Sequence, residues 1–172
     1  PATFQVGAFF SNGGRELYVQ RLLAADAEAA SVDLLTSGDA VVATVTSKNA
    51  GTDGNNLRVV ITAGSVASTY TLTLYKESGV AGDIADDILL ERYENIVFDD
   101  SASSDFAETV INLVSPNITV SDSAGGTPVS TTYPLTGGDN GTATTDTDYT
   151  DYKGTGSAVF EQFTSLDRPL VM

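Results

Sequence analysis

Residues 70–75 read YTLTLY, and residues 51–62 read GTDGNNLRVVIT. In the first stretch large apolar side chains alternate with threonines, which is the period-two pattern of a strand with one buried face. In the second stretch a run of turn-forming residues precedes another alternation, in which Leu57, Val59 and Ile61 are the apolar members. The two stretches predict antiparallel β-strands separated by short turns.

The predicted sheet extends to both sides of this region. Residues 41–46, 88–98 and 118–120 are rich in β-branched and other apolar side chains, which favours further strands. Gly, Asn and Asp residues interrupt the apolar runs at short intervals. This combination is typical of antiparallel sheet, so we expect a mainly-β chain.

One helix is predicted among the strands, at residues 105–114. Asp105 and Glu108 form a capping-box pattern at its start. Pro116 ends the helix, because the residue before a proline avoids helical geometry. The spacing of its apolar residues predicts a buried stripe made of Phe106, Val110, Leu113 and Val114.

Both ends of the chain carry further predicted elements. Residues 1–12 predict a helix that Asn12-Gly13-Gly14 ends, and residues 17–22 have strand composition. Towards the C-terminus we expect, in order, an exposed loop at 121–156, a helix at 157–166 and the beginning of a strand at 169–172. The chain starts at Pro1 instead of a Met and stops within the last predicted strand, so we expect a fragment cut at both ends.

The net charge of the chain is −15, from 23 acidic and 8 basic residues. The basic residues are scattered singly, so no basic patch offsets the repulsion between this charge and nucleic acid phosphates. Anionic lipid is repelled for the same reason, and no apolar run approaches the roughly 20 residues that a membrane helix needs. We therefore expect neither nucleic acid nor a membrane as a partner.

The chain contains no cysteine and no histidine. These absences exclude disulfide bonds and zinc sites of the common Cys/His kinds. They also exclude Ser-His-Asp and Cys-His catalytic arrangements, because the general base is missing. We expect the protein not to be an enzyme, and we assign no catalytic, cofactor-binding or metal-binding residue.

One candidate calcium site is formed by an acidic, glycine-containing stretch. Its members are Asp139-Asn140-Gly141, Asp146, Asp148 and Asp151. Closely spaced carboxylates beside a glycine turn are features of calcium loops. The stretch lacks the terminal bidentate Glu of such loops, so we favour a solvated acidic loop.

A second acidic cluster could supply the carboxylate pair of a glycosidase. Its members are Asp83, Asp86, Asp87, Glu91, Glu94, Asp99 and Asp100. The chain has no Trp on which a sugar ring could stack, so we interpret this cluster as solubilising surface charge. The glycines of residues 51–56 resemble a phosphate loop, but the run lacks the Gly-Lys-Ser/Thr ending and precedes a strand, which indicates a turn.

Four segments carry a family resemblance. Residues 6–22 (VGAFFSNGGRELYVQRL) combine a helix ending in two Phe, an Asn-Gly-Gly turn and a Tyr-Val-x-Arg strand. Residues 50–59 (AGTDGNNLRV) contain Gly-x-x-Gly-Asn-Asn-Leu before a strand, residues 91–95 read ERYEN, and residues 135–141 read LTGGDNG. In their order and spacing these segments resemble the contractile phage tail sheath proteins over about residues 6–172.

The resemblance implies the middle part of a sheath subunit, with an α+β, mainly β fold. Residues 24–136 would form an antiparallel β-sandwich or barrel-like insertion domain with one packed helix. Residues 1–23 would be a helix and strand of a flanking α/β domain. Residues 137–172 would add an exposed acidic loop rich in Thr, Gly and Asp, and then a helix and a strand of the same flanking domain.

The resemblance also implies a function. A sheath subunit is a structural protein that polymerises helically around the tail tube and, after a baseplate signal, contracts to drive the tube through the target cell envelope. Its partners would be other sheath subunits and the tail tube protein, with no cofactor or nucleotide. It would lie in the virion tail after assembly in the bacterial host cytoplasm. Without the terminal arms that join sheath subunits, we expect this chain alone to be monomeric.

Two other interpretations belong to different classes. The first is a β-sandwich binding or adhesin module on a phage or cell surface, which predicts a complete sandwich and binding to a glycan. The second is a carboxylate enzyme, which predicts a hydrolytic activity that is lost when one acidic pair is mutated.

Overall fold

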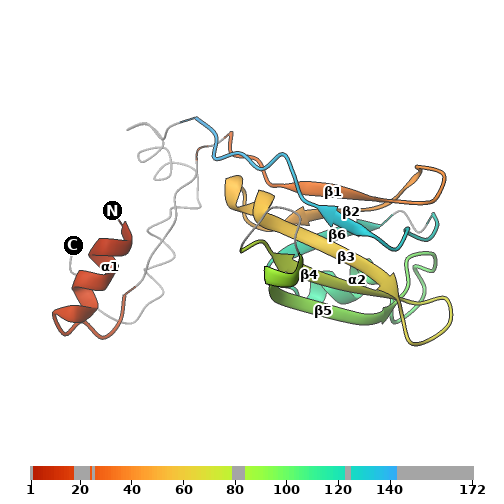
Figure 1. Ribbon diagram of the computed structural model, residues 1–172, viewed down its shortest axis with the longest axis horizontal. Helices are drawn as coiled ribbons and strands as arrows, with labels where there is room; N and C mark the ends of the chain where they lie inside the picture. The colour runs from red at the N-terminus through yellow and green to blue at the C-terminus, as the bar shows by residue number, and fades with distance from the viewer. Residues whose placement is uncertain (1, 18–23, 25, 79–83, 123–124, 143–172) are drawn as a thin grey trace. The chain divides into compact units, whose positions relative to one another are not determined.

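The computed structural model describes residues 2–17, 24, 26–78, 84–122 and 125–142 (Figure 1). The chain divides into two compact units. One consists of Pro1–Leu22 and Thr144–Met172, and the other, which we call the β unit, is Leu23–Ala143. The assignment of the flanking segments to an α/β domain stays a prediction. No helix in the described ranges combines the length and the apolar character that crossing a membrane requires.

The first unit contains helix α1, Ala2–Ser11, which confirms the predicted N-terminal helix. Asn12 Nδ2 donates to the Ala8 carbonyl at 2.7 Å, and Gly13 has a φ of 88°, so the Asn-Gly turn ends the helix as predicted. The other elements predicted near the termini lie outside the described residues, apart from Leu17. They are the strand at 17–22, the helix at 157–166 and the strand at 169–172.

The β unit is built from two antiparallel sheets (Figure 1). The first has the order β1-β2-β6 and comprises β1 (Ser31–Leu35), β2 (Val41–Ser47) and β6 (Ile118–Asp122). The second has the order β5-β4-β3-β7 and comprises β3 (Leu57–Ala63), β4 (Tyr70–Lys76), β5 (Ile88–Ile96) and β7 (Thr132–Pro134). The predicted α+β, mainly-β class is therefore confirmed.

The alternating residues of the two sheets form one core. Val59 and Leu74 are cross-strand partners, as are Ile61 and Leu72, and all four side chains are buried. From the other sheet Leu34, Val42, Val45, Ile118 and Val120 join the same cluster. The period-two pattern that predicts these strands therefore also selects the face that packs inward.

Each long side of the sandwich is closed differently. On one side Ser31 and Thr136 exchange two backbone hydrogen bonds, of 2.8 and 3.0 Å. On the other side helix α2, Ala107–Val114, packs mainly against β6. The Asn112 side chain donates to the Val120 carbonyl and accepts from its N–H, both at 2.7 Å. An amide side chain therefore takes the place of a neighbouring strand at the edge of β6.

The predicted start of α2 is wrong, and its predicted buried face is only partly right. The N-cap is Phe106 and makes no side-chain capping bond, so Asp105 does not act as predicted. Instead, Val97 accepts a hydrogen bond from the N–H of Ala107 and donates one to the Asp105 carbonyl. Of the predicted stripe, Phe106 is buried and Val110 packs half-buried against the core. Leu113 is 82% and Val114 61% exposed, and Ala107 and Ile111 are buried instead.

The predicted loop at 121–156 is also partly wrong, because it contains the end of β6 and all of β7. Tyr133 pairs with Val59 and is buried, and its hydroxyl donates to the Val129 carbonyl at 2.9 Å. A strand of three residues that ends in Pro134 is too short to show a period, so tertiary pairing decides its conformation.

A buried cluster of one arginine and two carboxylates lies on the outer face of the second sheet. Arg58 occupies an outward-facing position of β3, yet its side chain is only 6% exposed. It lies 2.5 Å from Glu77 and 2.9 Å from Asp87, whose side chain is fully buried. In the described residues neither carboxylate oxygen of Asp87 has a hydrogen-bond partner of good geometry, so the charge of Arg58 is what compensates it.

We predict that Arg58→Ala lowers the free energy of unfolding by about 3–5 kcal/mol, because it leaves Asp87 as an uncompensated buried charge. Urea denaturation followed by circular dichroism measures this loss. The matched control is Arg92→Ala, since Arg92 pairs with Glu94 at 2.9 Å but both side chains are exposed. That variant should lose less than about 1 kcal/mol. Equal losses in the two variants would contradict the prediction.

Candidate functional site: a polar joint

The predicted calcium residues do not form a metal site in the part of the chain that is described. Asp139, Asn140 and Gly141 lie at the end of the β unit, whereas Asp146, Asp148 and Asp151 lie outside the described residues. No group of three or more acidic side chains with metal-binding geometry occurs among the residues that the structure describes. Asp139 Oδ1 instead accepts the N–H of Gly141 at 2.7 Å.

The second acidic cluster is dispersed over different roles. Asp87 is buried beside Arg58, so the surface-charge interpretation is wrong for this residue. Glu91 is partly buried and hydrogen-bonded, whereas Glu94 is exposed and paired with Arg92. Of the others, Asp86, Asp99 and Asp100 are exposed, and Asp83 lies outside the described residues.

The main polar feature of the β unit is the place where the chain enters the unit and leaves it. We call residues 26–31 the incoming segment and residues 135–142 the outgoing segment. Glu28 and Asp139 exchange two backbone hydrogen bonds, of 2.9 and 3.0 Å. With the Ser31–Thr136 pair, these bonds align the two segments as an antiparallel ladder that continues the first sheet.

The two glycine- and asparagine-rich motifs meet at this ladder. Asn55 Nδ2 donates to the Gly138 carbonyl and Asn55 Oδ1 accepts the Gly138 N–H, both at 2.8 Å. Asn140 Oδ1 accepts the N–H of Thr52 at 3.2 Å, and Asn140 Nδ2 donates to Thr52 Oγ1 at 3.1 Å. The turn η1, Thr52–Asn56, is thereby bound to the outgoing segment, in accord with its interpretation as a turn. We call this assembly the joint.

Two glycines allow the close approach within the joint. A Cβ on Gly138 would lie 2.5 Å from the Gly51 carbonyl oxygen, and a Cβ on Gly54 would lie 2.8 Å from the Ala30 Cβ. Backbone cannot move aside as a flexible side chain can, so a substitution at Gly138 would separate the two loops. The glycines of both motifs therefore have a packing role.

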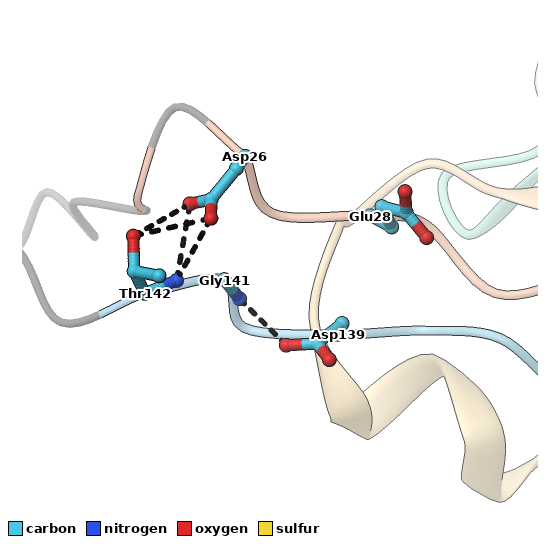
Figure 2. Close-up of a pocket in the computed structure, with 5 residues that line it drawn as sticks. All are labelled: Asp26, Glu28, Asp139, Gly141 and Thr142. Atoms are coloured by element: carbon cyan, nitrogen blue, oxygen red, sulfur yellow. Dashed lines mark hydrogen bonds between the residues drawn. The ribbon is translucent and has the colours of Figure 1, made fainter.

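The outer end of the joint is an Asp–Thr contact (Figure 2). The Asp26 carboxylate accepts the Thr142 N–H at 3.0 and 3.2 Å and the Thr142 hydroxyl at 3.1 Å. The Thr142 N–H lowers the pKa of Asp26 below its ordinary 3.8, because a hydrogen bond to the charged form favours that form. The folded state therefore stabilises the Asp26 anion.

A shallow hollow lies over this end of the joint, lined by Asp26, Glu28, Asp139, Gly141 and Thr142 (Figure 2). The Asp26 carboxylate is engaged by Thr142, and Asp139 is turned to the N–H of Gly141. The three carboxylates of this hollow repel anions, and its hydrogen bonds hold the incoming and outgoing segments together. We therefore interpret it as a structural contact between the two segments.

The ERYEN motif also has a structural role. The Glu91 carboxylate accepts hydrogen bonds from Tyr93 (2.7 Å), Ser115 (2.7 Å) and Asn117 (2.5 Å) and so ties β5 to the turn after α2. Burial, together with the bond to Glu91, raises the pKa of Tyr93 to about 12. At the other end of the motif, Asn95 Oδ1 accepts the N–H groups of Ser65 and Val66 and caps the β3–β4 turn.

Sequence reasoning missed Asp26 and Thr142 because nothing local distinguishes them, and their contact joins positions 116 residues apart. Asn55 and Gly138 lie within motifs that the sequence does single out. Their asparagines and glycines were a usable signal, but the sequence gives no reason to pair one motif with the other. Asn112 was missed as well, since an exposed Asn on a helix usually faces solvent.

We predict that Asn55→Ala destabilises the β unit by about 1–3 kcal/mol, because the polar backbone groups of Gly138 lose their partner. The adjacent Asn56→Ala is the matched control, since the described residues give the Asn56 side chain no hydrogen bond. Denaturant unfolding of both variants measures the difference. A loss in Asn56→Ala as large as that in Asn55→Ala would contradict the role of the joint.

The Asp26–Thr142 contact predicts a pH dependence. The pKa of Asp26 is depressed in the folded state, so its contribution to stability is present above pH 3.8 and is lost as pH falls through the lower folded pKa. Carboxyl NMR titration should place the wild-type pKa below 3.8. Thr142→Pro, which removes the N–H, should bring the pKa of Asp26 back towards its ordinary value, and Thr142→Val should largely retain the shift. Equal titration of all three proteins would contradict this assignment.

A solved protein shares this fold. The crystal structure of a sheath tail protein from Desulfitobacterium hafniense matches the chain with a TM-score of 0.57 and 21% sequence identity. The match covers 95% of this chain and 36% of that protein, so the chain spans little more than a third of its length. No protein-family model and no curated protein matches the chain. The chain therefore has a sheath-like fold.

Proposed function

We propose that the chain is part of a structural, non-enzymatic subunit of a contractile tail sheath. The observation that carries the proposal is the fold shared with a sheath tail protein over 95% of the chain. The motifs at residues 50–59 and 135–141, on which the sequence resemblance rests, also meet in space at the joint. Two motifs that hydrogen-bond to each other support a shared family architecture better than motifs that lie apart on the surface.

In the proposed function, subunits polymerise helically around the tail tube and contract to drive it through the target envelope. The partners are other sheath subunits and the tube protein, and the location is the virion tail after assembly in the host cytoplasm. Contraction of this kind rearranges interfaces between subunits whose domains move as rigid bodies. The joint suits such movement, because it holds the incoming and outgoing segments together within the β unit.

Electron microscopy tests this proposal. We predict that the protein expressed from its complete coding sequence forms hollow, transversely striated tubes. The same protein carrying Asn55→Ala should form fewer or irregular tubes, because the outgoing segment is held less firmly within the β unit, whereas Asn56→Ala should behave as wild type. A complete protein that forms no tubes, and instead binds an immobilised glycan, would contradict the proposal and favour the adhesin interpretation.

A further inference from the structure

The outgoing segment of the joint contains a chemically labile pair of residues, Asn140-Gly141. The sequence has one other Asn-Gly pair, Asn12-Gly13, at the end of α1. An Asn that precedes Gly is prone to deamidation, because glycine has no side chain to hinder attack of its backbone nitrogen on the Asn side-chain carbonyl. The sequence marks both pairs as equally labile, so any difference between them comes from the structure around each pair.

The joint requires both members of the pair. Gly141 has a φ of 72°, which favours glycine, and a Cβ at this position would contact the Asp26 carboxylate and lie 2.8 Å from the Ala27 nitrogen. Asn140 uses its amide as both an acceptor and a donor towards Thr52. Neither residue can therefore be replaced without the loss of a contact, so the packing of the joint itself creates a labile pair.

The closed joint opposes the first step of deamidation. In that step the Gly141 nitrogen must lose its proton and attack Cγ of Asn140. The Gly141 N–H instead donates to Asp139 Oδ1 at 2.7 Å, and the other carboxylates that line the same hollow disfavour a further negative charge (Figure 2). The two bonds to Thr52 hold the Asn140 amide in one orientation, whereas the attack requires it to turn towards the nitrogen.

We propose that Asn140 is a deamidation site controlled by the joint: it is protected while the joint is closed and reacts when the joint opens locally. The Gly141 nitrogen forms a bond to Cγ of Asn140, the bond from Cγ to Nδ2 breaks, and Nδ2 leaves as ammonia with the proton from Gly141. Water then opens the succinimide ring at either carbonyl and gives aspartate or isoaspartate at position 140. This site goes beyond the sheath function and does not depend on it.

The reaction would leave a permanent change in the joint. Isoaspartate continues the chain through its former side-chain carbonyl and so adds one carbon to the backbone between Asp139 and Gly141. The added length displaces the N–H of Thr142 from the Asp26 carboxylate, which accepts it at 3.0 Å in the closed joint. Because the reaction is irreversible, each conversion records one opening of the joint.

Peptide mass spectrometry of the 172-residue chain, incubated in mildly alkaline buffer with and without urea, tests the proposal. In urea both Asn-Gly pairs should convert at similar rates. In the folded protein Asn140 should convert at least about tenfold more slowly than in urea, because only the open joint reacts. Asn12 is exposed at a helix end, where fraying is common, and should be slowed less. An Asn140 rate that is equal with and without urea would overturn the proposal.

Two variants test whether the joint provides the protection. Asn55→Ala weakens the joint and should raise the Asn140 rate in the folded protein about tenfold, which corresponds to about 1.4 kcal/mol of easier opening. Asp139→Ala frees the Gly141 N–H and should raise the rate as well. Asn56→Ala should leave it unchanged, and the Asn12 rate should stay the same in all three. Variants that circular dichroism shows to be folded, yet convert Asn140 at the wild-type rate, would overturn the proposal.

Discussion

The β unit depends on one constraint: the segment by which the chain enters the unit and the segment by which it leaves must lie side by side. The backbone bonds of Glu28 with Asp139 and of Ser31 with Thr136 satisfy it. These bonds continue the first sheet beside β1. The incoming and outgoing segments are therefore hydrogen-bonded parts of the sandwich. A domain inserted into another chain needs its two ends close together, and this ladder provides that geometry. The two ends of the described β unit therefore lie side by side.

Polar side chains complete this architecture wherever backbone pairing stops. Asn55 supplies a donor and an acceptor to the outgoing segment, Asn112 does the same for β6, and Asn95 caps a turn. An amide side chain carries both a donor and an acceptor, so it can replace one residue of a neighbouring strand. These asparagines act at edges and turns, where a buried unpaired backbone group would cost about 1–3 kcal/mol.

Much of the sandwich can be predicted from the local pattern of apolar residues, whereas the contacts of the joint cannot. The alternation in residues 57–62 and 70–75 predicts β3, β4 and their buried faces, because side-chain direction in a strand repeats every two residues. The face of α2 could be predicted only in part: Phe106 and Val110 face the core as the stripe predicts, whereas Leu113 and Val114 are exposed. The backbone pairing of Val97 with Ala107 at the start of the helix leaves no trace in a local pattern. Contacts such as Asp26 with Thr142 depend on which distant segments meet, and a single sequence carries no record of that.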